Sequence, residues 1–384
     1  MDQLHENFSC FGISSKLIDN RWWKLLLNAS DIASHGNLSC LDELTEETNY
    51  LNINLLSPVQ WSEISNFCTR LGLFHISYLI FQKVANEYLS KEFQKKSCFI
   101  EKSELNLLAL KMHEIKFIKN SFSLTDIIKN RLYFFQARFL LHTLFHETLK
   151  YKSYGSSLAR SLISNKKVAI VCSKKSLIDN SEEINKFDSV VKFNYTSSFA
   201  REDAKLNTNR CDISFYNGSK LSSILEGNQL HIPQSVKLIV VRNKKQFKIL
   251  TDINEFNERS KLEFPTKSFL GKNLTGLPRA LIYLMRYKPS KVKIFNSDLM
   301  VTNSRIANYN SSTDDVQDLA ANNWLKGAVA HDFILQFKLV EYFLKKSNVE
   351  ADIQLSNIIQ NGLENYSLIM QKNYGIPFSI SQKC

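Results

Sequence analysis

Glycine and proline are scarce in this chain of 384 residues, with 11 and 6 residues, whereas phenylalanine is abundant with 26. Few positions therefore favour sharp turns, which argues against a loop-rich all-β architecture and for helices around a substantial core. The chain is longer than most single hydrophobic cores, so the length predicts two domains.

Closely spaced cysteines are also lacking. The seven cysteines are widely separated and odd in number, and no two of them form a CxxC pair. The sequence therefore indicates neither a zinc site nor a disulfide framework, and a reducing cytoplasm is the simplest interpretation.

Long apolar runs are missing as well. No uncharged stretch approaches the roughly 20 residues needed to cross a bilayer, and the first six residues, MDQLHE, lack the basic and apolar regions of a signal peptide. We therefore expect a cytoplasmic protein. Peripheral attachment at the inner membrane through a basic or amphipathic surface stays open.

Common catalytic motifs are absent too: the sequence contains no Walker loop and no GxGxxG, GxSxG or HExxH pattern. Their absence disfavours the usual nucleotide hydrolases, dehydrogenases, serine hydrolases and zincins.

Positive charge is present in excess, with a formal net charge of +12, but lysine and arginine are scattered rather than clustered. A diffuse basic surface suits anionic partners such as nucleotides, acidic sugars, lipid headgroups or nucleic acid. Plain solubility explains most individual lysines equally well.

Short apolar runs bounded by polar turns occupy the second half of the chain. Such runs are typical of strands that are buried on both faces of a parallel sheet. The expected strands are 168–172, 189–194, 211–217, 236–241 and 291–296, and the expected helices are 276–287, 330–345 and 351–372. The pattern predicts an α/β domain over residues 156–384. Ser173, Asn194 and Asn217 follow three of the strands, at the carboxyl ends where open α/β sheets bind ligands.

Helical periodicity dominates the preceding part, for which we predict an all-α domain over residues 1–155. Residues 1 to about 55 are polar and give no clear assignment, and Ser57-Pro58 then marks a helix start. The expected helices are 57–71, 73–91, 104–118 and 125–151. Helical-hairpin repeats are an open alternative, although no clean second copy of a repeat is found.

One histidine stands at a chemically suggestive position. His331 stands at the amino-terminal end of the helix expected over 330–345. The positive end of the helix dipole disfavours the cationic imidazolium, so a neutral ring able to accept a proton is favoured there. Such a ring suits a general base, although a lone histidine of this kind is more often structural than catalytic.

The order of these pieces resembles the sialyltransferase superfamily over residues 165–345. Residues 168–177 and 187–194 are similar to the opening and the "D-x-V-x-R-x-N" core of its large motif. Residues 274–277, followed by a helix and a strand, look like its small motif, and His331 matches the histidine of its very small motif.

The resemblance implies particular roles for several residues. Asn194 would contact the cytidine nucleotide, and His331 would act as the general base. The expected donor-binding residues are Ser173, Asn194, Asn217, Thr275, Gly276, Asp298, Arg305 and Tyr309. Of these, Arg305 and Tyr309 lie in a segment, 302–328, that is long enough to form a lid. Loop residues without a role are the alternative for both.

The sequence also departs from the family pattern. The usual Gly-Asn of the first turn is Cys172-Ser173, and the following Gly-Ser or Gly-Pro is Lys174-Lys175. These lysines either meet the donor's phosphate or carboxylate or simply face solvent. The glutamate found five residues after the histidine in the animal motif is Gln336 here.

The activity implied is inverting transfer of a 2-keto acid sugar, sialic acid or octulosonate (Kdo), from its cytidine-monophosphate (CMP) donor. The acceptor would be a hydroxyl of a bacterial surface glycan, either capsule or lipopolysaccharide. The resemblance implies no essential metal, and the CMP-sugar is a substrate rather than a cofactor; no nucleic-acid partner is expected. The alternatives are a helical-repeat scaffold or nucleic-acid-binding protein with a non-catalytic α/β module, and a sugar-nucleotide enzyme outside this superfamily.

Overall fold

The computed structural model describes residues 17, 19–32, 39–56, 58–84, 156–174, 178–196, 208–226, 231–241, 244–262, 275–302 and 333–374. The chain forms two compact units. The first comprises residues 1–140, 320–335 and 361–384, and the second comprises residues 141–319 and 336–360. The sequence predicts a boundary near residue 155 but does not anticipate that the chain returns to the first unit after residue 360.

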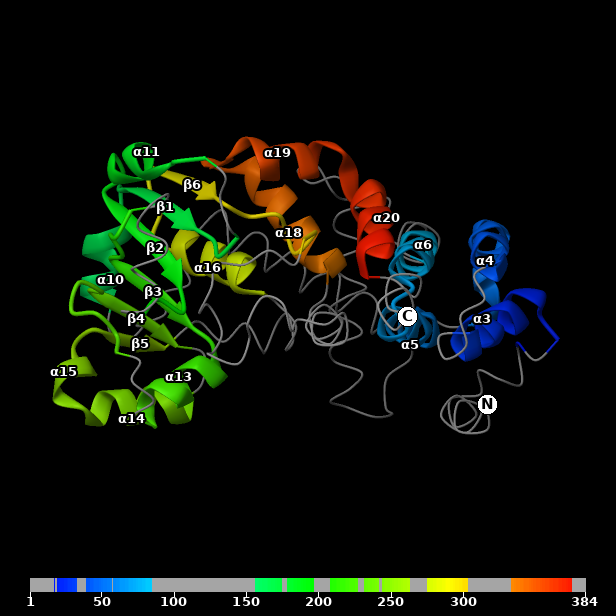
Figure 1. Cartoon of the computed structure of the whole chain (residues 1–384), viewed down its shortest axis with the longest axis horizontal. Helices are drawn as coiled ribbons and strands as arrows, with labels where there is room; N and C mark the ends of the chain where they lie inside the picture. The colour runs from blue at the N-terminus through cyan, green and yellow to red at the C-terminus, as the bar shows by residue number, and fades with distance from the viewer. Residues whose placement is uncertain are drawn as a thin grey trace, which may run out of the picture. The chain divides into compact units, whose positions relative to one another are not determined.

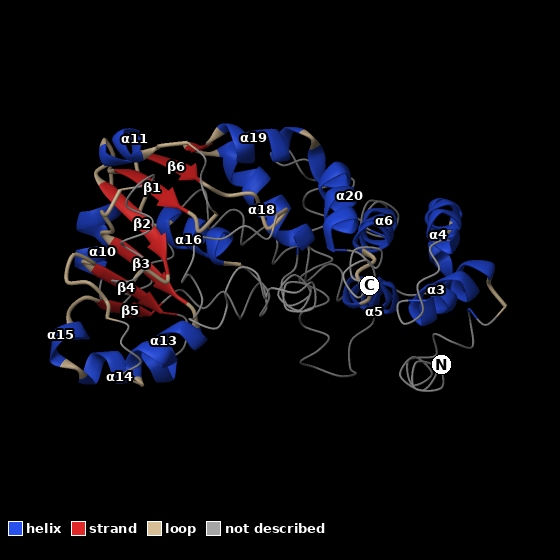
Figure 2. Cartoon of the chain, in the orientation of Figure 1, coloured by secondary structure: helices blue, strands red, loops and turns tan. Residues whose placement is uncertain are grey.

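The second unit contains a seven-stranded sheet in which every pair of neighbouring strands is parallel. The strands are β1 (Lys167–Val171), β2 (Ser189–Phe193), β3 (Ile213–Tyr216), β4 (Leu238–Val241), β5 (Ser260–Leu262), β6 (Lys291–Phe295) and β7 (Val349–Ala351). Their order is β5-β4-β3-β2-β1-β6-β7, and the arrows in Figure 2 point to the same edge of the sheet. The predicted α/β class is confirmed, and so are the five longer strands within about two residues of their predicted ends.

Helices cover both faces of this sheet, which explains why its strands read as continuous apolar runs. On one face the rings of Phe215 and Tyr283 pack at 5.4 Å, which places α16 (Gly276–Met285) against β3. The same face contacts α10 (Ser156–Ile163), because the Ser189 hydroxyl donates to the Leu162 carbonyl at 2.7 Å.

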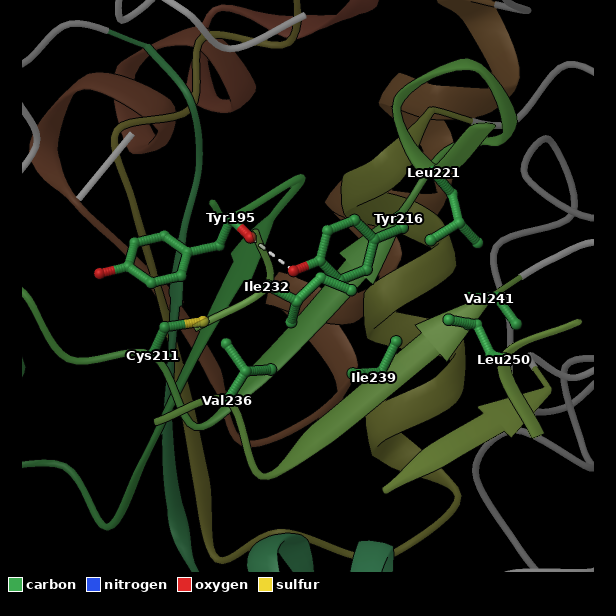
Figure 3. Close-up of a cluster of buried hydrophobic side chains, with 9 residues drawn as sticks. All are labelled: Tyr195, Cys211, Tyr216, Leu221, Ile232, Val236, Ile239, Val241 and Leu250. Carbon is green, nitrogen blue, oxygen red and sulfur yellow. Dashed lines mark hydrogen bonds between the residues drawn. The ribbon is translucent and has the colours of Figure 1, made fainter. Parts of the chain in front are cut away.

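The other face carries a buried cluster that joins strands β3 and β4 to α13 (Gly218–Leu225) and α14 (Lys244–Asp252). Figure 3 shows its nine residues: Tyr195, Cys211, Tyr216, Leu221, Ile232, Val236, Ile239, Val241 and Leu250. A second cluster under α11 (Ser181–Asn185) includes Ala169, Val171 and Ile184. The short α15 (Asn254–Asn257) precedes β5.

One expectation for the chain end needs correction. One helix is expected over 351–372, but the chain forms β7, then α19 (Ile353–Gln360) and α20 (Gly362–Tyr374). Gly362 adopts φ 81°, a left-handed conformation that interrupts a continuous helix. The helix α18 begins at Phe333 and ends at Lys346 in the described chain.

The first unit is helical in its described part (Figure 1), with α3 (Arg21–Ile32), α4 (Ser39–Tyr50), the 3₁₀ turn η1 (Ile53–Leu55), α5 (Pro58–Arg70), α6 (Phe74–Val84) and α20. The indole N–H groups of Trp22 and Trp61 donate to Thr48 Oγ1 and to the Ile53 carbonyl, each at 2.7 Å. Buried tryptophans thus contribute to the packing of residues within 1–55, the part of the chain whose polar composition gives no clear prediction. The expected helices 104–118 and 125–151 lie outside the described residues.

Candidate functional site

The candidate site lies at the carboxyl ends of the strands, near the point where the order in which strands are added to the sheet reverses. Strands β1 to β5 add in one direction, whereas β6 and β7 add on the opposite side of β1. The β1/β6 boundary is therefore the topological switch point, the usual ligand position in open parallel sheets. Polar residues follow the strands at this edge: Ser173 and Lys174 after β1, Asn194 after β2, Asn217 after β3, Asn296 and Asp298 after β6, and Asp352 after β7.

Two of the predicted residues, Asn194 and Asn217, are directly hydrogen-bonded. The backbone N–H of Asn217 donates to Asn194 Oδ1 at 3.0 Å, and the side chain of Asn217 caps α13 by accepting from the Lys220 N–H at 2.8 Å. Asn194 adopts φ 52°, a left-handed conformation that asparagine tolerates better than most residues. Neighbouring strands β2 and β3 thus present a pair of asparagines at their carboxyl ends.

The turn that carries Asn194 is fixed by the core beneath it. The Tyr195 N–H donates to Ser214 Oγ at 3.2 Å, and the Tyr216 hydroxyl donates to the Tyr195 carbonyl, as the dashed line in Figure 3 marks. Burial raises the pKa of the Tyr216 hydroxyl, which keeps it protonated as a donor. Asn194 therefore stands on a rigid support, as a preorganised binding residue requires.

The side-chain NH₂ group of Asn194 is the chemically available part of this pair. A backbone N–H can only donate, so the atom of Asn194 that faces Asn217 must be the carboxamide oxygen. Asn194 is only 2% exposed, yet its NH₂ group makes no hydrogen bond to any residue that the structure describes. A nearly buried donor without a partner among the described residues favours a ligand that offers an acceptor oxygen or nitrogen.

The amino end of α16 reaches the same edge of the sheet. A Cβ added to Gly276 would lie 2.9 Å from Cδ1 of Phe193, the last residue of β2, so only glycine permits this approach. The first N–H groups of a helix carry partial positive charge and bind anions. The predicted pair Thr275-Gly276 thus places an anion-binding helix end beside β2, the strand that leads to Asn194.

Gln336 links three segments around this point. The Thr275 hydroxyl donates to Gln336 Oε1, and Gln336 Nε2 donates to the Leu299 carbonyl at 2.8 Å. The side chain thereby ties the start of α16 to α18 and to the turn after β6. Gln336 stands where the animal motif has a glutamate. Its amide both accepts and donates here, whereas an ionised carboxylate could only accept.

Replacing Gly276 with alanine should test this close approach. The new methyl group must displace the buried Phe193 ring, so we expect the free energy of unfolding to fall by about 1–3 kcal/mol. The control is Gly218→Ala at the start of α13, where the added Cβ would meet its nearest atom at an ordinary 3.6 Å. Chemical denaturation measures both variants, and equal stability of the two would contradict the packing described here.

The carboxyl ends of β6 and β7 carry a second polar group of residues. Asp298 is 2% exposed and accepts from the Met300 N–H at 3.0 Å, the Thr302 N–H at 2.9 Å and the Thr302 hydroxyl at 2.6 Å. The Lys174 ammonium lies 3.5 Å from its Oδ2 atom. Asp298, which the resemblance assigns to donor binding, thus also holds the turn in which Leu299 and Met300 adopt left-handed φ angles of 51° and 71°.

Asp352 belongs to this second group, although sequence reasoning did not select it. Its carboxylate accepts from the Asn296 N–H at 2.6 Å and from the Leu355 N–H at 3.0 Å. Burial raises the pKa of the Asp352 carboxyl, while these two N–H groups and the ammonium groups of Lys174 and Lys293 act in the opposite direction. The sequence signal that could have identified Asp352 is its position directly before a helix, because aspartate is a common N-cap residue.

The remaining predicted residues contribute less to this geometry. Ser173 follows β1 and is partly exposed. His331, Arg305 and Tyr309 lie outside the described residues, so their predicted roles stay predictions. Within the described ranges, no three His, Cys, Asp or Glu side chains gather as metal ligands.

Among the helices of the described chain, none combines the length and the apolar character needed to span a bilayer. No protein-family model, curated protein or solved structure matches the chain.

Proposed function

We propose that this protein is an inverting glycosyltransferase that moves a 2-keto acid sugar, sialic acid or Kdo, from its CMP-activated donor to a hydroxyl of a bacterial surface glycan. The acceptor would belong to a capsule or lipopolysaccharide. In this proposal the parallel sheet is a Rossmann-like domain of the sialyltransferase type, and the preceding helices form an all-α domain.

The observation that carries the proposal is the placement of three separate sequence pieces at one edge of the sheet. Asn194 ends β2 and bonds the backbone of Asn217 after β3, and Gly276 packs on Phe193 at the end of the same β2 strand. Residues 168–177 and 187–194 carry the resemblance to the large motif, and residues 274–277 carry the resemblance to the small motif. Their proximity is what a shared nucleotide site requires.

The proposed chemistry divides the work among these residues. The Asn194 NH₂ group and the first N–H groups of α16 would hold the cytidine nucleotide, with Arg305 and Tyr309 as candidate phosphate contacts. The acceptor hydroxyl would attack the anomeric carbon as the bond to the phosphate oxygen breaks, and CMP would leave with the bonding electron pair. His331 would take the hydroxyl proton, which keeps the charges balanced through the step.

Titration with nucleotides tests this proposal most directly. CMP binds only the folded protein, so at about 100 times its Kd it should stabilise the fold by about 2.7 kcal/mol. We expect a rise in melting temperature with CMP and CMP-sugars, with little or none from AMP or UMP at the same concentration. A donor screen that measures CMP release in the presence of glycan acceptors would then identify the sugar. A protein that shows no cytidine-specific shift would instead fit a scaffold.

A further inference from the structure

Lys174 is a cation at the switch point that forms one ion pair, but no hydrogen bond, with the residues that the structure describes. It follows β1, and its side chain is 12% exposed. Its Nζ atom lies 3.5 Å from Asp298 Oδ2, longer than the roughly 2.7–2.9 Å of a strong charge-assisted hydrogen bond. No hydrogen bond from this ammonium to any other described residue is present.

The nearby carboxylates are committed to backbone groups rather than to Lys174. Asp298 accepts two backbone N–H groups and the Thr302 hydroxyl, and Asp352 accepts the N–H groups of Asn296 and Leu355. These donors offset much of the carboxylate charge, because oriented N–H groups supply partial positive charge. Asp298 thus orients the lysine as an ion-pair partner, while no residue that the structure describes accepts a hydrogen bond from its three N–H groups.

The other lysine of this region is already paired. Lys293, on β6, forms an ion pair with Glu183 on α11. Of these two lysines, Lys174 is therefore the one that has no hydrogen-bonded carboxylate among the described residues. A sparsely solvated ammonium of this kind gains most from an anionic ligand.

We propose that Lys174 is a positioning residue that donates to an anionic oxygen of the donor, either of its phosphate or of the sugar carboxylate. This inference rests on the proposed function and deepens it, because it names a donor contact at the turn where the sialyltransferase superfamily usually has glycines. Lys174 would orient the donor and would take no part in proton transfer.

Binding of cytidine, CMP and CMP-sialic acid to wild type and to Lys174→Met separates the two sources of the anion. Methionine keeps the length of the side chain and removes the charge. If the phosphate is the partner, Lys174→Met should weaken CMP and CMP-sialic acid by about tenfold to a hundredfold and leave cytidine unchanged. If the sugar carboxylate is the partner, only CMP-sialic acid should weaken. Lys174→Arg should retain most of the affinity.

Matched controls keep the experiment decisive. Lys186→Met removes an exposed lysine that pairs with Glu182 on α11, and it should leave all three affinities unchanged. Wild-type affinity for CMP and CMP-sialic acid in Lys174→Met would overturn the inference and leave the proposed function intact. Equal weakening of cytidine would also overturn it, since that result indicates a structural effect. Failure of the wild-type protein to bind any cytidine ligand would refute both proposals.

Discussion

Replacing His331 with alanine is expected to lower the rate of sugar transfer by about 100- to 10,000-fold, the usual contribution of a general base. The acceptor hydroxyl is a poor nucleophile while it keeps its proton, and the imidazole would remove that proton as the bond to the anomeric carbon forms. His331 precedes α18 in the sequence, and the positive end of a helix favours the neutral ring that a base requires. CMP affinity should stay within about threefold of wild type, because a base acts on the acceptor rather than on the nucleotide.

The matched control for this variant is His231→Ala. His231 is an exposed residue before β4 and has no part in the proposed site. Transfer rates at saturating donor and acceptor, together with CMP binding, should separate the two variants. Near-normal turnover in His331→Ala would remove His331 from the role of base, and a loss of CMP binding would indicate a role in folding or donor binding instead.

The central strands could be predicted from the sequence because burial on both faces leaves a simple pattern. Residues 168–171 of β1 are apolar and fully or almost fully buried, and so is β4. The outer strands β5 and β7 are only three residues long, and each contains a charged residue, Lys261 or Glu350. Such edge strands lack the apolar run and are often charged to prevent further pairing, so sequence reasoning missed them.

The α3 and α4 helices were missed for a related reason. In α4 only Leu44 and Thr48 are buried among the positions whose burial is described, whereas α3 buries Trp22, Trp23, Leu25, Leu26, Leu27 and Ala29. Positions 22, 25, 26 and 29 of α3 follow the spacing of one helix face, but this short apolar stretch is surrounded by polar residues in the first 55 positions of the chain. Composition alone therefore underestimated the order of this segment.

The candidate site could be predicted only in outline. Polar residues after apolar strands indicate which side chains meet at one edge, and this reasoning selects Ser173, Asn194 and Asn217, whereas Asp298 comes from the resemblance. It could not show which atoms of these side chains remain available, because this depends on contacts between distant segments. The bond from Asn217 to Asn194 and the approach of Lys174 to Asp298 are examples. Asp352 was missed because it follows a strand too short to recognise.

Replacing Asn194 with aspartate is expected to lower the affinity for CMP on the order of 100-fold. The substitution keeps the oxygen that accepts from the Asn217 N–H but exchanges the free NH₂ donor for a second oxygen. That oxygen cannot donate to the nucleotide when it is ionised, and it repels the phosphate or a pyrimidine carbonyl at short range. The loss should therefore exceed that of Asn194→Gly, which tolerates the left-handed backbone and lacks only the side chain. Calorimetric titration with CMP measures both.

Asn185→Asp is the control that makes this comparison specific. Asn185, on α11, also uses its Oδ1 atom as an acceptor, in this case for the Thr208 hydroxyl at 2.7 Å, and its side chain is exposed. The same chemical change at this position should leave CMP affinity unaltered.

Because Asn194 is 2% exposed, melting temperatures of the variants must show that Asn194→Asp is folded. If it is not folded, Asn194→Gly provides the measurement of CMP affinity. Wild-type affinity in a folded Asn194 variant would show that its NH₂ group does not face the nucleotide, and the site at the end of β2 would then have to be abandoned.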